Sequence, residues 1–324
     1  MTLTRWIVAL MLSAASAGVA AQAWLPQRNV ELIVSTAPGG SNYKTARLLE
    51  RIIVDNKLLG TTLAVVNKPG AGGAVTNAYV SQYPGNPHYL FIGTPNLISQ
   101  HILGVSAASY KDFTPVVSLF NDYVVLAVNA NSPIRTGKDL IERFRTKPES
   151  LTIGFASALG NHHHIAAGLL TKAVGGNVRG LKMVVFKGSA DAIVALLGSH
   201  IDVVSTGAVN AIAHVAAGKM RVVGVAAPQR LGGTLANVPT WKEQGFDVVY
   251  GSWRALIGPR GLSAAHLAYW ENLLRKVTES AEWKADLDSN YWSSYFLAGA
   301  HFTKSLDKEY AETRALMAEI GLIK

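Results

Sequence analysis

Several short turns in this 324-residue sequence place glycine and small polar side chains directly after an apolar run. The first lies in LIVSTAPGGSNYKTARL, residues 32–48, where Gly39, Gly40 and Ser41 separate a predicted strand from a predicted helix. A helix N-terminus offers free backbone N–H groups and the positive end of the helix dipole, and glycine lets a ligand approach the backbone. The turn therefore predicts a site for an anion.

Five further turns repeat this arrangement. They are VNKPGAGG at 66–73, GTPN at 93–96, SALGNHHH at 157–164, KGS at 187–189 and STG at 205–207. Because ligands bind beyond the carboxyl ends of strands in open α/β sheets, six such turns predict one cleft lined by backbone amides and hydroxyls. The first turn matches neither G-x-x-x-x-G-K-[ST] nor G-x-G-x-x-G, which argues against a nucleotide site.

Catalytic and metal-binding patterns are weak. The sequence contains no cysteine, no G-x-S-x-G and no H-E-x-x-H, so it lacks a cysteine nucleophile and these serine-hydrolase and zinc-binding motifs. Adjacent residues of a helix point in different directions, so His162, His163 and His164 cannot converge on one metal ion. We expect no metal and no cofactor, with one or two imidazoles facing the cleft and at least one buried as a structural group. Two alternatives stay open at the next motif: Arg254 either pairs with a carboxylate or lies on the surface, and Trp253 either lines the pocket or belongs to the core.

The elements that must position these turns alternate along the chain. Apolar β-forming runs predict strands at 30–34, 63–66, 89–92, 116–119, 123–128, 152–155, 183–186, 203–204 and 220–226. A 3.6-residue spacing predicts helices at 45–56, 165–174, 190–197 and 209–217, then three consecutive helices at 264–279, 281–289 and 303–320. Buried strands alternating with helices predict an α/β fold with parallel sheets.

Two segments are expected to connect two domains. Residues 112–128 would carry the chain into a second domain, and residues 248–257 would bring it back. The predicted domains are 24–122 plus 246–324 and, between them, 123–245. A chain of this length can bury two hydrophobic cores.

The N-terminus and the charge limit the class of protein. Arg5 precedes an apolar stretch at 6–19, and Ala21-Gln22-Ala23 follows it. This pattern predicts a signal peptide over residues 1–23, cleaved near Ala23, and an exported chain. The formal net charge is +9, but the basic residues are scattered rather than gathered in a stripe, so no nucleic-acid partner is expected.

The order of these motifs resembles the Bug (TctC-like) family, the periplasmic solute-binding receptors of tripartite tricarboxylate transporters. The similar segments are APGGS at 37–41 with ARL at 46–48, NKPGAGG at 67–73, KDFTP at 111–115, FKGS at 186–189, HVAAGKMR at 214–221, VPT at 238–240 with Glu243 and Gly245, and Trp253 with LIGP at 256–259. The resemblance spans essentially the whole mature sequence. It implies a two-domain periplasmic-binding-protein fold of type II, closing like a Venus flytrap, with a helical C-terminal segment.

The resemblance also implies a function and a set of site residues. Members bind small organic carboxylates and present them to membrane permease subunits, so we expect a periplasmic protein, a monomer, with no catalysis. The carboxylate end of the site is expected at Pro38, Gly39, Gly40, Ser41, Asn42, Tyr43, Thr94 and Asn96. The end that selects the rest of the ligand is expected at Ser157, Asn161, His162, His163, Lys187, Gly188, Ser189 and Thr206, with Trp253 and Arg254 beside the return crossing.

This sequence departs from the family pattern at three places. Asn42-Tyr43 replaces the usual Thr-Asp, Asn161-His162-His163 replaces a serine-rich turn, and Arg254 replaces an aromatic residue. These changes add rings or positive charge, so we expect a ligand with an additional anionic or aromatic group. Two other functions stay open: a periplasmic hydrolase or isomerase with His163 or His164 as base, and a sensor that docks on a signalling partner.

Overall fold

The computed structural model describes residues 24–156 and 158–324, so the predicted signal peptide and Ser157 lie outside the described residues. The strands are β1 Val30–Val34, β2 Leu63–Asn67, β3 Tyr89–Gly93, β4 Phe113–Asn129, β5 Thr152–Ala156, β6 Lys182–Phe186, β7 Val203–Gly207, β8 Met220–Val225, β9 Gly251–Pro259 and β10 Ser293–Ala298. The helices are α2 Ser41–Asp55, α3 Ala74–Val80, α4 Asn96–Ile102, α5 Gly137–Thr146, α6 His162–Ala173, α7 Ser189–Leu197, α8 Ala208–Ala216, α9 Ala264–Glu279, α10 Ala281–Asn290 and α11 Gly299–Glu319.

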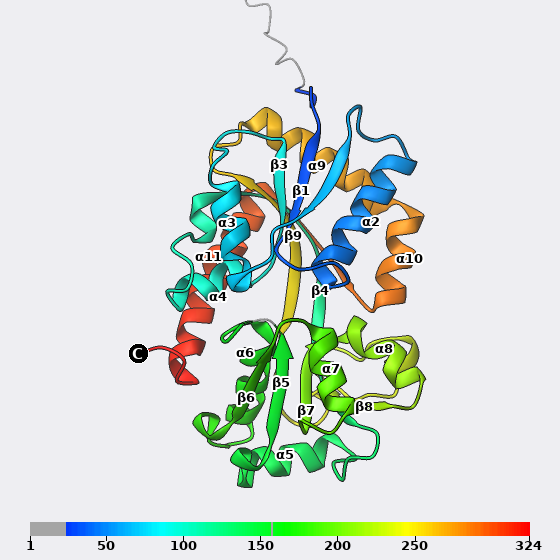
Figure 1. The fold of residues 1–324 in the computed structure, drawn as a ribbon, viewed down its shortest axis with the longest axis vertical. Coiled ribbons are helices and arrows are strands. Elements are labelled where there is room, and N and C mark those ends of the chain that lie inside the picture. The colour runs from blue at the N-terminus through cyan, green and yellow to red at the C-terminus, as the bar shows by residue number, and fades with distance from the viewer. Residues whose placement is uncertain (1–23, 157) are drawn as a thin grey trace, which may run out of the picture.

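The strands form one continuous path in the order β2-β1-β3-β9-β4-β7-β5-β6, and β10 and β8 both pair with β4. Figure 1 shows two lobes joined through the middle of this path. We call the lobe with β1, β2, β3, β9, β10 and the start of β4 the first lobe. The second lobe contains the end of β4 with β5, β6, β7 and β8.

The first lobe is a sheet covered by helices on both faces. Alternate residues of a strand point to opposite faces, and β1 follows this rule. Leu32 packs with α2, α9 and α10, whereas Ile33 packs with α3, α4 and α11. Strand β9 repeats the alternation, since Leu256 belongs to the first cluster and Trp253 to the second. The two faces of β9 therefore meet different helices.

The second lobe follows the same plan. Strand β4 contributes Leu126 to a cluster with α5 and α6, and its neighbour Val125 to a cluster with α7 and α8. The N-termini of α6, α7 and α8 each follow the carboxyl end of a strand, β5, β6 and β7. The polar turns that the sequence predicted at these strand ends therefore lie at the edge of the second sheet that Figure 1 shows facing the first lobe.

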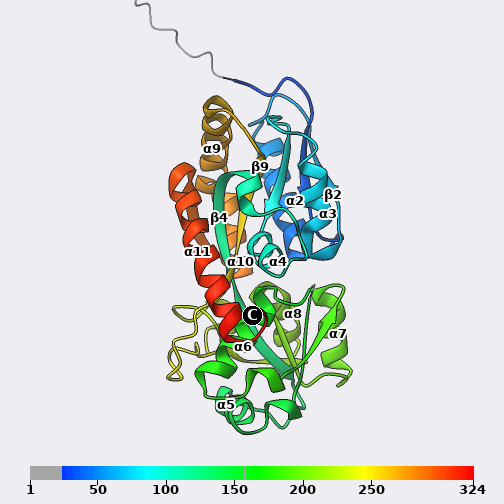
Figure 2. The same cartoon turned by 90° about the vertical axis from the view of Figure 1, so that its left-hand side faces the viewer.

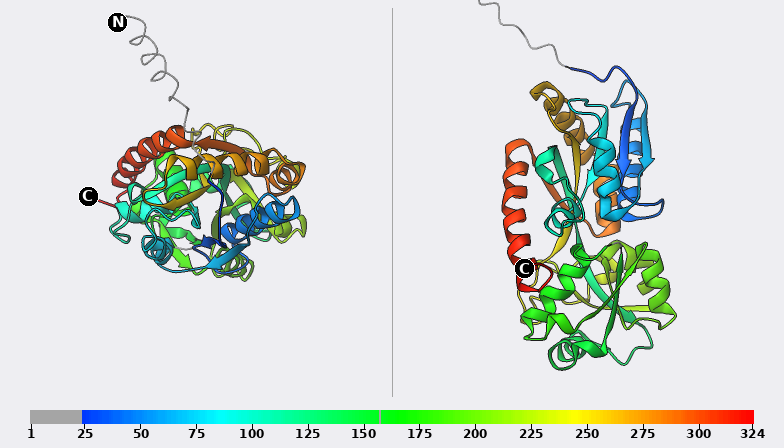
Figure 3. Two further views of the ribbon diagram at one scale, coloured as in Figure 1. Left: turned by 90° about the horizontal axis from the view of Figure 1, so that it is seen from above. Right: turned by 60° about the vertical axis from the view of Figure 1, so that its left-hand side comes forward.

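Strands β4 and β9 and helix α11 connect the lobes. Strand β4 pairs with β9 from Phe113 to Tyr123, then with β7 from Val124 onward. Helix α11 begins in the first lobe, and its Met317, together with Ile320 directly after the helix, packs against Ile165 of α6 in the second. Figure 2 shows this helix running along one side of the molecule, and the right-hand view of Figure 3 places the C-terminus beside the second lobe.

Three expectations about the elements were wrong in part. The strands predicted at 116–119 and 123–128 form one long strand, β4, because its polar middle crosses between the lobes. The sheet is parallel toward both ends, as expected, but β9 and β4 run antiparallel to their neighbours. Strand β10 interrupts the predicted run of C-terminal helices, which still includes α9, α10 and α11. In the part of the chain that the structure describes, no helix is both long and apolar enough to cross a membrane.

Candidate functional site

The register of two long strands brings an acid and a base together between the lobes. Asp122 of β4 lies directly opposite Ser252 of β9. Arg254 follows Ser252 by two residues, so its side chain leaves the same face of the sheet. All three residues are buried. The neighbouring Trp253 points to the other face, where its indole packs on Phe302 and donates to Glu309 across 2.7 Å.

The Arg254 guanidinium is held by acceptors from β9 and from the start of α2. Its Nη1 donates to the Ser252 backbone oxygen at 3.0 Å and to the Ser252 hydroxyl at 2.5 Å. Its Nη2 donates to the Ser41 hydroxyl at 2.8 Å and lies 3.7 Å from Oδ2 of Asp122. Its Nε has no partner among the described residues. The guanidinium is therefore fixed in position and still has an unused donor.

Asp122 faces the start of α8. A Cβ atom at Gly207 would lie only 2.3 Å from the Asp122 Oδ2 atom, so glycine makes room for this carboxylate. Burial raises the pKa of Asp122 to about 6, against the lowering effects of Arg254, the Ala208 backbone N–H, Lys44 and the Ser41 hydroxyl. Burial is the larger effect because a charged carboxylate loses its hydration in the interior.

The N-terminus of α6 supplies two imidazoles. Asn161 caps this helix by accepting from the backbone N–H groups of His163 and His164, and its own amide donates to the Ala156 carbonyl. Ser205 of β7 donates to the His163 carbonyl at 2.9 Å. The His162 and His163 rings lie 4.0 Å apart and are both buried. The turn is thus rigid and presents both rings.

Electrostatics keep these two imidazoles neutral. Burial lowers the pKa of His162 well below its usual value, with further lowering by His163 and Arg254. Burial and then Arg254 lower the pKa of His163 to about 3. The Arg254 contribution to both indicates that the guanidinium and the imidazoles share one region. We call Ser41, Asp122, His162, His163, Ser252 and Arg254 the buried polar cluster.

The third histidine of the run has a structural role. His164 accepts from the backbone N–H of Gly160 at 2.9 Å, and its ring stacks on Phe155 at 5.3 Å. Burial lowers its pKa to about 4. The expectation that at least one of the three imidazoles is a buried structural group is met by this residue.

The buried polar cluster carries several unused hydrogen-bonding atoms. Asp122 Oδ1, His162 Nδ1, His163 Nδ1 and Arg254 Nε have no partner among the described residues, although each is buried. Nearly all buried polar atoms in proteins are hydrogen-bonded to protein or to ordered water, so these atoms are free to bind water or the polar groups of a ligand. Among residues 24–156 and 158–324, no group of three or more His, Cys, Asp or Glu is arranged to hold a metal ion.

The turns of the first lobe lie next to this cluster through α2. Ser41 is the first residue of α2 and the partner of Arg254, and the following Asn42 donates to the Ser35 hydroxyl at 3.2 Å. Thr94 is buried, and Asn96 donates to the Gly72 carbonyl at 3.3 Å. The side-chain oxygens Thr36 Oγ1, Asn96 Oδ1 and Gln100 Oε1 are also buried without a partner in the described residues.

One contact from this region crosses between the lobes. Gln100 of α4 donates to the Leu159 carbonyl at 3.2 Å, and a Cβ atom at Gly160 would meet Leu103 at 2.2 Å. The turn before α6 is therefore packed tightly against α4. The two lobes therefore contact each other beside the cluster, where Arg254 and the imidazoles are buried.

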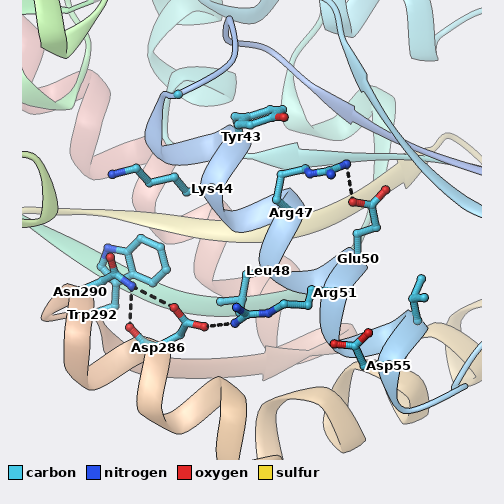
Figure 4. A pocket seen from close by; sticks show the side chains of 12 residues that line it. Tyr43, Lys44, Arg47, Leu48, Glu50, Arg51, Asp55, Asp286, Asn290 and Trp292 are labelled. Atoms are coloured by element: carbon cyan, nitrogen blue, oxygen red, sulfur yellow. Dashed lines mark hydrogen bonds and ion pairs between the residues drawn. The ribbon is translucent and has the colours of Figure 1, made fainter.

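A groove of about 750 Å³ lies outside the buried polar cluster, between α2 and α10, and is lined in part by Gly39, Tyr43 and Lys44 (Figure 4). Two of its basic groups are paired, because Arg51 contacts Asp286 and Arg47 contacts Glu50, and the third, Lys44, is exposed to solvent. Figure 4 shows both pairs along the outer face of α2. The buried polar cluster is a candidate site separate from this groove, and its unpartnered polar atoms favour it for ligand binding.

The structure brings some of the predicted site residues together and leaves others apart. Ser41, His162, His163 and Arg254 belong to the cluster, and Asn161 holds the helix that carries the imidazoles. Trp253 lies in the core, the second of its two alternatives, and Arg254 lies beside a carboxylate, the first of its own. Among the described residues, no side-chain hydrogen bond or ion pair joins the cluster to Pro38, Gly39 and Lys187, all exposed, to Gly40, Gly188 and Ser189, half-buried, or to Thr206, which accepts from Asn210.

Sequence reasoning missed Asp122 and Ser252. Asp122 stands in the segment predicted to cross between domains, but no motif surrounds it. The signal that would have found both residues is the pairing of the two crossing segments, which the sequence alone does not align.

Comparisons with known proteins identify the family of the chain. The family model described as "Tripartite tricarboxylate transporter family receptor" matches residues 49–322. Protein BugT of Bordetella pertussis is 26% identical over 299 residues, which cover 89% of this chain and 88% of the relative. A TctC solute-binding protein from Polaromonas, solved without ligand, is 26% identical, with a TM-score of 0.69 over 91% of this chain and 99% of the other.

A third comparison concerns the fold alone. The R. palustris protein Rpa4515, solved with adipate, is 23% identical, with a TM-score of 0.82 over 91% of this chain and 98% of the other. The expected two-domain periplasmic-binding-protein fold is thereby confirmed. The chain belongs to the family of tripartite tricarboxylate transporter receptors, which are periplasmic solute-binding proteins.

Proposed function

We propose that this receptor captures one small organic carboxylate in the buried polar cluster and presents it, unchanged, to the membrane permease of its transporter. The observation that supports the ligand class most strongly is the buried Arg254 guanidinium with its unpartnered Nε. Arginine stays charged in proteins and binds carboxylates through paired N–H donors. The structurally similar Rpa4515 was solved with adipate, which is a small organic carboxylate.

Each lobe contributes a part of the site in this proposal. The first lobe binds the carboxylate through Arg254, Ser41 and the backbone at the start of α2, with Thr94 and Asn96 nearby. The second lobe reads the rest of the ligand through His162 and His163. Lys187, Gly188, Ser189, Thr206 and Ser157, which lies outside the described residues, stay predictions for this end. The ring faces and nitrogens of neutral imidazoles suit an aromatic or hydrogen-bonding group.

Binding is coupled to closure of the lobes. The predicted domains, 24–122 plus 246–324 and 123–245, would move as two bodies about β4 and β9, and the contact between Gln100 and Leu159 would form as they close. Closure removes water from the guanidinium and the ligand, which strengthens their attraction. The closed form is then the one that a permease would recognise.

No catalysis is proposed. A histidine base needs a carboxylate or similar group to orient it, and the Nδ1 atoms of His162 and His163 have no such partner in the described residues. Burial also holds both imidazoles neutral, with the pKa of His163 at about 3. The protein would act in the periplasm, after residues 1–23 direct its export, as a monomer that meets its permease.

Mass spectrometry of the ligand tests this proposal. Protein purified without added carboxylates is unfolded, and the released small molecules are compared with those from Arg254→Gln purified in the same way. We expect an organic acid in near-equimolar amount from the wild type and little from the variant. A neutral or cationic compound released equally by both proteins would contradict the proposal.

A further inference from the structure

Asp122 is a carboxylate that the protein itself places beside the guanidinium proposed to bind the ligand. We propose that the ligand carboxylate replaces Asp122 as the ionic partner of Arg254, and that Asp122 takes up one proton from solvent as this happens. The receptor would then capture a carboxylate together with a proton. This inference rests on the proposed function, because it concerns the same guanidinium.

Arg254 and Asp122 are not joined by a direct hydrogen bond, so a ligand carboxylate can take the place of Asp122. The 3.7 Å separation between Arg254 Nη2 and Asp122 Oδ2 is too long for a hydrogen bond. Arg254 Nε and Asp122 Oδ1 also have no partner in the described residues. Asp122 therefore balances the charge of Arg254 without using its donors. A ligand carboxylate would gain those donors at little loss of existing hydrogen bonds.

The charged groups around Asp122 can balance the charge of only one buried anion. Arg254 faces it from β9 and Lys44 from the first turn of α2, and Lys44 is exposed to solvent. From the second lobe, Asp122 meets the uncharged Ala208 backbone N–H at the start of α8. His162 and His163 of α6 face Arg254 as neutral groups, because burial lowers the pKa of both. One buried guanidinium thus serves one buried carboxylate.

A second carboxylate in this buried region raises the energy of both anions. Two like charges at one site shift the pKa of one of them upward, and an uncompensated buried charge is strongly unfavourable. Asp122 is the group best prepared to become neutral, since burial already raises its pKa to about 6. Arg254 remains charged throughout, because a guanidinium does not lose its proton in proteins.

This exchange of carboxylates determines whether the affinity for the ligand rises or falls with pH. Above the pKa of free Asp122, binding takes up close to one proton, so the affinity falls about tenfold for each pH unit. Below that pKa, Asp122 is already protonated and the affinity levels off. In Asp122→Asn the site cannot take up this proton, so the affinity stays nearly constant with pH and exceeds that of the wild type at alkaline pH.

Calorimetric titrations measure the proton directly. Acetate, benzoate and adipate serve as probes, and each is titrated at pH 7.5 in phosphate and in Tris, whose different ionisation enthalpies report the protons taken up. We expect close to one proton per bound probe in the wild type and none in Asp122→Asn. Asp286→Asn, which alters a carboxylate in the exposed pair with Arg51, is the matched control and should retain the uptake.

The possible outcomes separate this inference from the proposed function. Binding of a probe without proton uptake by the wild type would overturn the inference and leave the carboxylate site standing. Uptake that persists in Asp122→Asn and disappears in His163→Gln would assign the proton to an imidazole and overturn the role of Asp122. If no probe bound to the wild type at any pH, the carboxylate proposal and this inference would both be rejected. The wild-type proton count does not depend on whether any variant folds.

Discussion

The Asp122 Oδ2 atom lies 3.7 Å from Nη2 of Arg254, and both side chains are almost fully buried where β4 and β9 pass between the lobes. A buried ion pair rarely adds stability, because the loss of hydration offsets the attraction of the charges. An apolar pair of similar volume would serve a hinge equally well. The position and chemistry of this pair are therefore better explained by binding than by folding.

Arg254→Gln should lower the affinity for a carboxylate that the wild type binds by about 10- to 100-fold or more, the usual cost of losing hydrogen bonds to a charged group. The glutamine keeps a polar side chain in the cleft and removes the charge. Equilibrium titration of both proteins at pH 6.5 measures the change.

The matched control for this prediction is Arg260→Gln, which removes an exposed arginine close to the end of β9. Its affinity should equal that of the wild type. Equal weakening by both substitutions would mean that Arg254 acts only through the net charge of the protein.

Gly207→Ala should destabilise the protein by about 1–3 kcal/mol, as overpacking of a tight interior does. The added Cβ would lie 2.3 Å from the Asp122 carboxylate, which must move away from Arg254. Urea unfolding measures the loss. Gly60→Ala is the control, because a Cβ there has no atom within 4 Å.

The clash itself can be isolated by a double-mutant cycle. In an Asp122→Ala background, Gly207→Ala should cost much less, since the carboxylate that it meets is gone. An unchanged cost in that background would show that Gly207 is needed for another reason.

Glu309→Gln should stabilise the protein relative to wild type at pH 8 but not at pH 5. Burial raises the pKa of Glu309 to about 7, against the lowering effect of its hydrogen bond from Trp253. The folded protein therefore binds more protons than the unfolded chain between about pH 4.5 and pH 7, so the contribution of Glu309 to stability is lost as the pH rises. Glutamine keeps the acceptor for Trp253 and does not titrate.

The expected gain at pH 8 is on the order of a few kcal/mol. It is read from urea unfolding of both proteins at the two pH values. Glu149→Gln, at an exposed position of the second lobe, is the control and should show no such gain. A gain of equal size at pH 5 would argue that packing, and not charge, separates Glu309→Gln from the wild type.

His163→Gln should lose less stability in acid than the wild type. Burial lowers the pKa of His163 to about 3, so between that value and about pH 6.5 the unfolded chain binds more protons than the folded protein. Stability contributed by the neutral imidazole is therefore lost as the pH falls. Asp122 and Glu309 act in the opposite direction in this window, so only the difference between variant and wild type isolates His163.

Unfolding free energies at pH 7 and pH 5 measure this difference, which should favour the variant in acid by on the order of a few kcal/mol. His301→Gln changes an exposed histidine of α11 and should follow the wild type. Parallel curves for His163→Gln and wild type would contradict the neutral, buried state of this imidazole.

Local patterns predicted much of the fold and the ends of the strands that surround the site. The turn at Gly39 and Gly40 does separate a buried strand from a helix, and Asn161 does begin a helix. Both features depend on residues close together in sequence, where glycine, capping groups and apolar spacing act directly. Strand β10 was missed because its residues are only partly buried and its partner, β4, lies far away in the chain.

The pairing of Asp122 with Arg254 could not be predicted in the same way. It depends on the register between β4 and β9, and a shift of one residue would turn either side chain to the opposite face. That register is set by the packing of both lobes and by irregularities along β4. The sequence therefore left Arg254 with two alternatives and gave Asp122 no role.

A comparison of acids with their amides tests whether Arg254 binds a carboxylate. Protein freed of bound solutes by unfolding and refolding is titrated with benzoate against benzamide and with adipate against adipamide, which differ in charge but little in shape. The account predicts that an acid binds, that its amide does not, and that Arg254→Gln abolishes the distinction. An amide that binds the wild type as tightly as its acid would contradict a carboxylate site at Arg254.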